Sequence, residues 1–201
     1  MSNYGTHYPN FDVMREQEHW DSHTREIVTK RLKNETWPYQ HLSSREADAL
    51  ERLCSILLDD DRFPAISYVV YHFDTLLRSD IGESQRKVGV PKQSDLIRSG
   101  LAWLDQACED RYGLKFVALD KPDQEDAIQQ AVNGGFAGAS ESDAIPVKDW
   151  IDKILTEAVA AYYSHPSIWS EIGYAGPAYP RGYVRSELGL TDPWEARRDG
   201  K

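Results

Sequence analysis

Cysteine is scarce in this chain of 201 residues, which contains only Cys54 and Cys108. A disulfide-stabilised scaffold and an iron–sulfur cluster both require more thiols than these two. We therefore expect the two cysteines to be small buried apolar residues, with a single disulfide as the alternative. No apolar stretch approaches the roughly 20 residues of a membrane-spanning helix, so we expect no direct membrane insertion.

Positive charge is also in deficit, because 23 lysines and arginines face 33 aspartates and glutamates, giving a formal net charge of −10. Nucleic acids and anionic membranes bind positive surfaces that displace their counterions, so we expect neither as a partner. The first residues lack a basic segment, an apolar run and a twin arginine. We therefore expect no export signal and a cytoplasmic protein, or one that is exported together with a partner.

No segment alternates apolar and polar residues with the period of a strand. Apolar residues instead recur at helical spacing. Ser43 and Glu46 form a predicted capping box, Ser94 is expected to cap the fourth helix, and Gly113 to end it. The prediction is an all-α protein, an irregular bundle of about six helices with an irregular tail rich in aromatic residues and proline. The expected helices span residues 21–34, 43–58, 64–79, 94–112, 120–132 and 146–163.

Composition divides the chain into a polar N-terminal arm (1–20), a helical domain (21–163) and an irregular C-terminal tail (164–201). Six tryptophans and eleven tyrosines are many for this length, and four of these aromatic residues fall between Trp169 and Tyr183. Aromatic side chains bury a large area at low entropic cost, which favours an interface. The alternative is a strap over the protein's own core. The predicted partner interface comprises His165, Pro166, Trp169, Tyr174, Gly176, Pro177, Tyr179, Pro180 and Tyr183.

Two other motifs invite a catalytic interpretation. His19 and His23 are four residues apart with Glu18 and Asp21 nearby, a spacing that can hold zinc on a helix, although capping or polar packing is the favoured reading. The glycines of residues 134–138 follow no strand, so they indicate a linker, and the chain itself is expected to bind no flavin or nicotinamide. A catalytic role for His165 is less favoured than a hydrogen bond within the tail. No catalytic residue, cofactor site or metal ligand is predicted.

Several segments, in order and spacing, resemble the small-subunit family of gluconate 2-dehydrogenase (subunit 3). The first is GLAWLDQACEDRYG from Gly100 to Gly113, followed by Phe116 and by LDKPDQED at 119–126. The later ones are AYYSHP at 161–166 and IGYAGP at 172–177. The resemblance extends from about Ser43 to Tyr183.

This resemblance implies a large partner subunit, a flavoprotein of the glucose–methanol–choline oxidoreductase type that holds FAD and oxidises a sugar or sugar acid. The family usually carries a twin-arginine signal. Its absence here fits a cytoplasmic branch whose large subunits resemble sugar or glycoside dehydrogenases, including those that oxidise the sugar C3 hydroxyl. The resemblance transfers no catalytic residue to this chain.

The leading hypothesis is therefore a non-catalytic small subunit that stabilises the FAD-bearing subunit and shapes its pocket. Its alternatives are a metal-dependent enzyme using His19 and His23, or a chaperone that releases the flavoprotein. The leading hypothesis predicts that Trp169→Ala or Tyr179→Ala weakens the complex, by about 2 kcal/mol or more for a hot spot.

Overall fold

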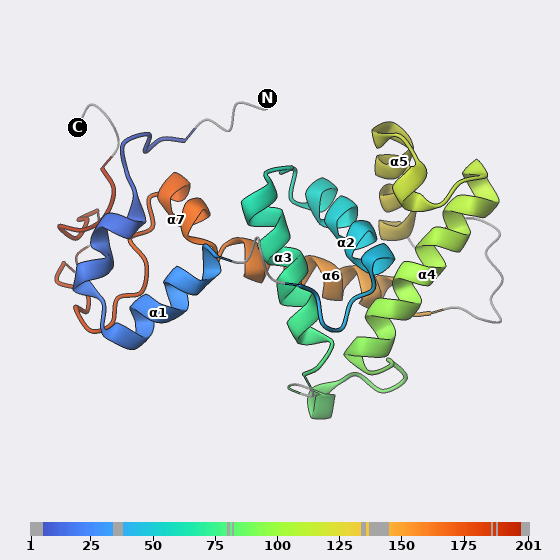
Figure 1. Cartoon of the computed structure of the whole chain (residues 1–201), viewed down its shortest axis with the longest axis horizontal. Helices are drawn as coiled ribbons and strands as arrows, with labels where there is room; N and C mark the ends of the chain where they lie inside the picture. Colours follow the sequence, from blue (N-terminus) through green and yellow to red (C-terminus); the bar gives the residue numbers. More distant parts are fainter. Residues whose placement is uncertain are drawn as a thin grey trace. The chain divides into compact units, whose positions relative to one another are not determined.

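The computed structural model describes residues 6–33, 38–79, 81, 83–133, 136, 145–185, 187 and 189–197. Within these residues there are seven α-helices, three short 3-10 helices and no strand, which confirms the all-α class (Figure 1). The six predicted helices correspond to α1 (Ser22–Arg31), α2 (Ser44–Leu57), α3 (Phe63–Leu76), α4 (Gln93–Tyr112), α5 (Lys121–Val132) and α6 (Val147–Tyr162). Four further helices were not predicted: η1 (Val13–His19), η3 (Glu83–Gln85), η4 (Phe116–Ala118) and α7 (Pro166–Ile172).

The chain packs into two compact units. Unit 1 is formed by residues 1–37 together with 161–201, and unit 2 by residues 38–160. Both ends of the chain thus belong to the same unit, and η1 and α1 pack with the tail. The three segments expected from composition, with boundaries at residues 20 and 163, stay a prediction.

Local signals set most helix ends of unit 2. At the start of α2, the Ser43 hydroxyl accepts a hydrogen bond from the Glu46 amide and the Glu46 carboxylate accepts one from the Ser43 amide, which confirms the capping box. Gly113 ends α4 in the left-handed conformation, at φ 76°. The carboxylate of Asp120 caps α5 by accepting from the Asp123 amide at 3.1 Å.

The start of α4 differs from the prediction. The helix begins at Gln93, so Ser94 is its second residue and not its cap. The carboxylate of Glu83, in η3, accepts a hydrogen bond from the Gln93 amide at 2.7 Å and so satisfies a free N–H of the first turn from outside the helix. The Gln93 side chain in turn donates to the carbonyls of Leu76 and Ser79 at the end of α3.

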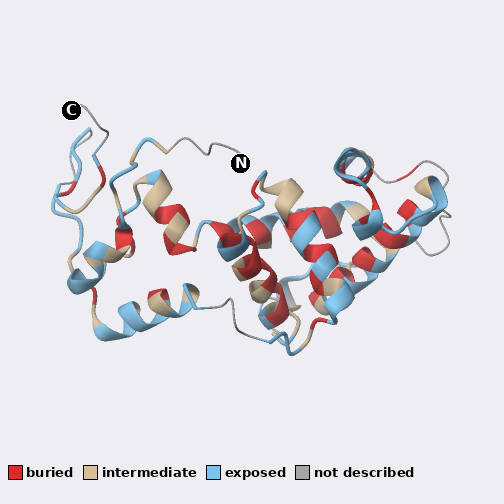
Figure 2. Cartoon of the chain, turned by 45° about the horizontal axis from the view of Figure 1, so that its top comes forward, coloured by how far each residue is buried: buried red, intermediate tan, exposed pale blue. Residues whose placement is uncertain are grey.

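The core of unit 2 is built from large apolar residues on its helices and on η4. Figure 2 colours the buried residues red along these helices. Gly100 of α4 lies against the ring of Trp150 of α6, where a Cβ atom would come within 2.2 Å of the indole nitrogen. Asp105 accepts a hydrogen bond from the Phe116 amide, and the Gln124 side chain donates to the Phe116 carbonyl. The side chains with less than 2% exposure in this unit include Trp150, Phe73, Phe116, Leu50, Leu53, Ile66, Ile97, Leu104 and Ile154.

Both cysteines are buried and free. Burial raises the pKa of the Cys54 thiol to about 12, and burial with a further contribution from Asp105 does the same for Cys108. The prediction of two small buried residues is confirmed, and the disulfide alternative is wrong. No helix in the described part of the chain combines the length and the apolar composition needed to cross a bilayer.

Candidate functional site

The predicted interface residues lie in unit 1, where Trp169 of α7 is central to a small core. Its ring is 5% exposed and packs with Val13, Trp20 and Val28 from the N-terminal segment. The indole nitrogen donates to the Tyr163 carbonyl at 2.5 Å. Trp169 therefore joins the two ends of the chain, and its first role is to hold unit 1 together.

Arg31 strengthens this connection between α1 and the tail. Its guanidinium lies over the Trp169 ring at 5.5 Å and donates to the Ser164 carbonyl at 2.8 Å. The ring of Tyr174 makes an edge-to-face contact with the same indole, with the ring centroids 5.3 Å apart. The amide of Val13 also donates to the Ser170 hydroxyl.

His165 and Pro166 begin α7. The buried His165 side chain accepts a hydrogen bond from the Ser167 amide through Nδ1, which also lies 2.6 Å from the Ser167 hydroxyl. Pro166 occupies the first turn, where its missing N–H costs nothing. The expected hydrogen bond within the tail is present, and it gives His165 a capping role.

Two glycines let aromatic rings of the N-terminal segment lie against the tail. Gly173 and Gly176 both have positive φ, 76° and 80°. A Cβ atom would lie 2.6 Å from the Tyr8 ring at Gly173 and 2.6 Å from the Trp20 ring at Gly176. Only glycine satisfies both the backbone conformation and the close approach.

The remaining predicted residues face solvent. Tyr179 and Tyr183 are each 70% exposed, Tyr174 and Pro180 are also exposed, and Pro177 is half-buried. His165, Pro166, Trp169 and Gly176 are buried within unit 1. The nine residues therefore comprise four buried ones that hold the tail in place, four exposed ones and the half-buried Pro177.

The exposed tyrosines lie on residues 177–185, which we call the tyrosine loop. Arg181, in its middle, points inward with a side chain only 8% exposed. Its guanidinium lies 4.8 Å from the Trp194 ring, donates to the Ala175 carbonyl at 2.6 Å, and lies 3.8 Å from the carboxylate of Glu16. Burial lowers the pKa of Arg181, and Glu16 opposes that shift.

Asp192 holds the other end of the tyrosine loop. It is 2% exposed, and its carboxylate accepts hydrogen bonds from the amides of Val184 at 3.0 Å and Arg185 at 2.7 Å. Its own amide donates to the Glu195 carboxylate. Arg181 and Asp192 were not identified from the sequence, because arginine and aspartate are mostly exposed in folded proteins.

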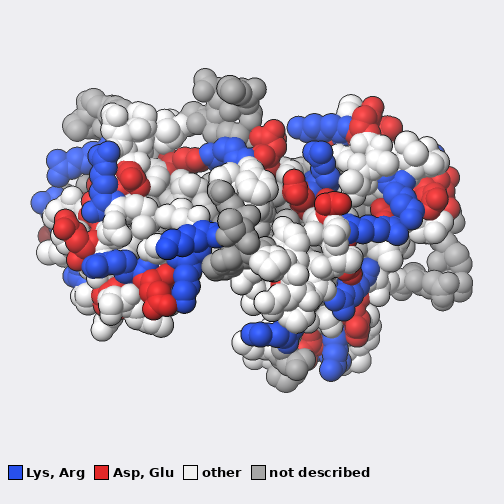
Figure 3. Space-filling model, in the orientation of Figure 1, with Lys and Arg blue, Asp and Glu red and all other residues white. Residues whose placement is uncertain are grey.

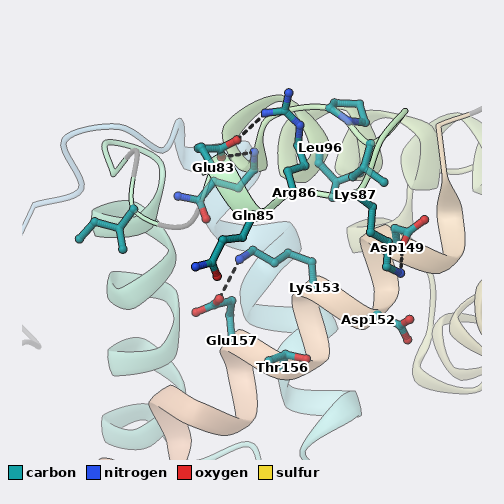
Figure 4. Close-up of a pocket in the computed structure, with 14 residues that line it drawn as sticks. Glu83, Gln85, Arg86, Lys87, Leu96, Asp149, Asp152, Lys153, Thr156 and Glu157 are labelled. Atoms are coloured by element: carbon teal, nitrogen blue, oxygen red, sulfur yellow. Dashed lines mark hydrogen bonds and ion pairs between the residues drawn. The ribbon is translucent and has the colours of Figure 1, made fainter.

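Unit 2 has a separate pocket of about 330 Å³ between residues 81–91 and α6 (Figure 4). Ion pairs cross or edge it, with Lys87 2.5 Å from Asp149 and Lys153 2.9 Å from Glu157. Glu157 also lies 2.8 Å from Nε2 of His72 on α3. The hydrogen bond with His72, with a further contribution from Lys153, lowers the pKa of Glu157 to about 2, although burial opposes this.

These paired charges connect α6 to α3 through His72 and to the segment before α4 through Lys87. They therefore have a structural role in the wall of the pocket. Elsewhere on the surface, charges of opposite sign lie close together on the face that Figure 3 shows. Ion pairs outside the pocket include Glu26 with Lys30 at 2.7 Å and Arg111 with Asp126 at 3.2 Å. The acidic excess is therefore spread over that face.

His19 and His23 belong to different elements, η1 and α1. Asp21 between them caps α1 by accepting from the amides of His23 and Thr24, as the capping interpretation expects. His19 lies 3.8 Å from Glu16. Within the described ranges, no group of three or more histidine, cysteine, aspartate or glutamate side chains could hold a metal ion. The glycine linker at 134–138 lies outside the described residues, except for Phe136.

Comparison with known proteins identifies one family. The family model described as gluconate 2-dehydrogenase subunit 3 matches residues 44–176, more than half of the chain. No curated protein and no solved structure matches the sequence. The matched range includes Gly100, Asp105, Phe116 and His165, whose side chains or backbone make the structural contacts described above.

Proposed function

Because the chain belongs to the gluconate 2-dehydrogenase subunit 3 family, we propose that it is the non-catalytic small subunit of a flavin-dependent sugar or glycoside dehydrogenase. Its partner is a large subunit of the glucose–methanol–choline type, which holds FAD and oxidises the sugar. This chain binds that subunit, stabilises its fold and shapes its pocket.

The family match over residues 44–176 is the observation that carries this proposal. Three residues within the resemblance support it, because each has a structural task in this chain. Gly100 admits the Trp150 ring, Asp105 holds the Phe116 backbone, and His165 caps α7. A folded body that presents a surface is what an accessory subunit requires.

The exposed tyrosines supply a suitable contact region. Tyrosine, tryptophan and arginine are enriched among residues that dominate interface energies, and obligate subunits usually bury about 2,000 Å² or more in total. Tyr179 and Tyr183 are well placed for this role because they are 70% exposed. Trp169→Ala is a poor probe of the interface, because it removes a side chain from the core of unit 1 and is expected to destabilise that unit whether or not Trp169 contacts a partner.

Co-expression tests the proposal directly. The large flavin-binding subunit is produced with and without this chain, and its soluble yield, FAD content and sugar oxidation are measured. We expect soluble, FAD-loaded and active enzyme only in the presence of this chain, in a complex that survives gel filtration.

A large subunit that is equally soluble and active alone would contradict the proposal. A complex that dissociates once FAD is incorporated would instead identify this chain as a chaperone that releases its client. Activity of the isolated chain with stoichiometric metal would favour the alternative based on His19 and His23.

A further inference from the structure

The N-terminal part of unit 1 lies against the tail with few buried side chains of its own. We call residues 6–33, which include η1 and α1, the N-terminal cover. Of these residues, only Val13, Trp20 and Val28 are buried. By contrast, α2 alone has five buried residues and α3 has seven. Because local stability follows the apolar contacts that a segment makes, we expect the cover to open more readily than the helices of unit 2.

The short helices of the cover also depend on the tail. The helix α1 has 10 residues, and isolated helices shorter than about 12–15 residues are marginal in water. It therefore requires packing, yet Val28 is its only buried residue, and the neighbouring Ile27 is 40% exposed. The 3-10 helix η1 has seven residues and likewise buries one, Val13. Neither element has the length or the buried area to persist away from the tail.

Unpaired donors at the contact between cover and tail lower the free energy of opening further. The indole Nε1 of Trp20, on the cover, and the Nε and Nη1 of Arg181, on the tail, are buried without a hydrogen-bond partner among the described residues. The Trp20 ring lies against Gly176, and Nη1 of Arg181 lies 3.8 Å from the carboxylate of Glu16 on the cover. A buried donor without a partner loses its hydrogen bonds to water and regains them when the contact opens.

The closed contact is nonetheless specific, which distinguishes the cover from a loose chain end. The rings of Tyr8 and Trp20 fit against two glycines of the tail, and a Cβ atom at either glycine would lie 2.6 Å from a ring carbon. The Thr6 hydroxyl donates to the Glu171 carbonyl at 2.7 Å. A segment that is held in one defined position by few contacts has two states, a closed one and an open one.

We propose that the N-terminal cover is released from the tail while unit 2 stays folded, and that its opening controls access to the surface of the tail around Trp169. In the closed state, Val13, Trp20 and Val28 pack on Trp169 and leave it 5% exposed. In the open state, that indole is accessible from solvent. The cover is thus a conformational switch built into unit 1.

Hydrogen exchange of the wild-type, full-length chain measures the opening without any substitution. We expect the amides of α1 to exchange at least about 100-fold faster than those of α2 and α3, and at least about tenfold slower than in an unstructured peptide. Mass spectrometry at pH 7 follows both. Equal exchange in α1 and α2 would overturn the proposal, because the cover would then open only together with unit 2. Exchange of α1 at the unstructured rate would also overturn it, because no closed state would exist.

A thiol placed under the cover separates its release from fraying of α1. Val28 is 1% exposed and packs with Trp169, so in Val28→Cys the new thiol reacts with a maleimide only when the cover leaves the tail. The buried Cys54 and Cys108 of unit 2 are references within the same molecule. We expect the new thiol to react about 100-fold faster than these two, and about tenfold or more slower than the thiol of Ile27→Cys, which is exposed on the same helix.

A rate equal to that of Cys54, or equal to that of the thiol in Ile27→Cys, would overturn the proposal. Circular dichroism verifies that each variant is folded. If Val28→Cys does not fold, hydrogen exchange of the wild-type chain decides alone.

A clash under the cover should shift the equilibrium toward the open state. Gly176→Ala, added to Val28→Cys, places a Cβ atom 2.6 Å from the Trp20 ring at a φ of 80°. We expect the new thiol to react about tenfold or more faster, with the rates of Cys54 and Cys108 unchanged.

Gly182→Ala is the matched control for this clash. Its φ is 69°, but no atom lies within 4 Å of the added Cβ, so it introduces the backbone strain without the contact. We expect it to change the rate less than about threefold. Equal rates in the two glycine variants would overturn the proposal, because the fit of Trp20 would then not hold the cover closed. These measurements use the chain alone, so their outcome is independent of the proposed large subunit.

Discussion

At the scale of single residues, buried aspartates hold segments of backbone that have no regular partner. Asp74 of α3 is the clearest case, because its carboxylate accepts hydrogen bonds from the amides of Gln40, His41 and Leu42. Burial raises the pKa of Asp74, but these three donors outweigh it, so that its pKa lies below the usual value of 3.8. Its contribution to stability is present above pH 3.8 and is lost as the pH falls through the lowered pKa.

Replacement of Asp74 by asparagine should therefore destabilise unit 2. The amide keeps one acceptor oxygen for three N–H donors and loses the charge, so we expect a loss of about 1–3 kcal/mol in the free energy of unfolding. Urea unfolding at pH 7 measures it. Asp48→Asn, at an exposed position of α2, is the control. Equal urea midpoints for the two variants would contradict the stabilising role of Asp74.

Gly100 offers a second test of packing at a single position. A Cβ atom there would lie 2.2 Å from the nitrogen of the buried Trp150 ring, so Gly100→Ala must shift a large side chain within a filled core. We expect destabilisation by about 1–3 kcal/mol, despite the higher helix propensity of alanine. Thermal unfolding followed by circular dichroism measures this.

The neighbouring exposed Ser99→Ala is the matched control, expected to change stability by no more than about 0.5 kcal/mol. A Gly100→Ala variant as stable as this control would show that the Trp150 ring moves aside freely.

At the scale of elements, side chains from one helix cap the end of another helix or pair with a side chain on its surface. Glu83 of η3 caps α4, and His72 of α3 is tied to Glu157 of α6. The contact from Glu83 explains why the helix at 93–112 was predicted from its own residues while its start at Gln93 was not. The short elements η1 and α7 also escaped prediction, since seven residues hold too few apolar positions to show a helical period.

The link between α3 and α6 should respond to acid. Glu157 has a pKa of about 2 in the folded chain against 4.5 for its ordinary value, so its stabilisation is complete above pH 4.5 and is lost as the pH falls toward 2. Allowing for its partial exposure to solvent, Glu157→Gln should lose about 1–2 kcal/mol at pH 7. Urea unfolding at several pH values measures this difference, which should shrink toward pH 2.

The exposed Glu125→Gln on α5 controls for loss of a carboxylate on the surface. A Glu157→Gln deficit of the same size at pH 7 and at pH 3 would show that the lost interaction does not depend on ionisation.

At the scale of the whole molecule, each unit has its own apolar core, and that of unit 2 is continuous in sequence from residue 38 to 160. About 120 residues with a buried core suffice for independent folding. We therefore expect a fragment of residues 38–160 to be helical by circular dichroism and to unfold cooperatively in urea.

Gly100→Ala should lower the urea midpoint of that fragment. This is the control, because a fragment that had only collapsed non-specifically would not respond to a change in core packing. A helical fragment without a cooperative transition would show that unit 2 depends on unit 1. Unit 1, by contrast, brings together residues from both chain ends, so neither of its segments alone contains the core formed by Val13, Trp20, Val28 and Trp169.

The sequence by itself determined the all-helical class, the six longer helices, the capping box at Ser43 and the left-handed stop at Gly113, because these depend on residues within a few positions of one another. It also showed that the tail is rich in aromatic residues, without distinguishing a strap from an interface. Only the tertiary structure decided that Trp169 is buried while Tyr179 is exposed. That outcome depends on contacts between distant residues, such as the one from the Val13 amide to the Ser170 hydroxyl, which no local pattern encodes.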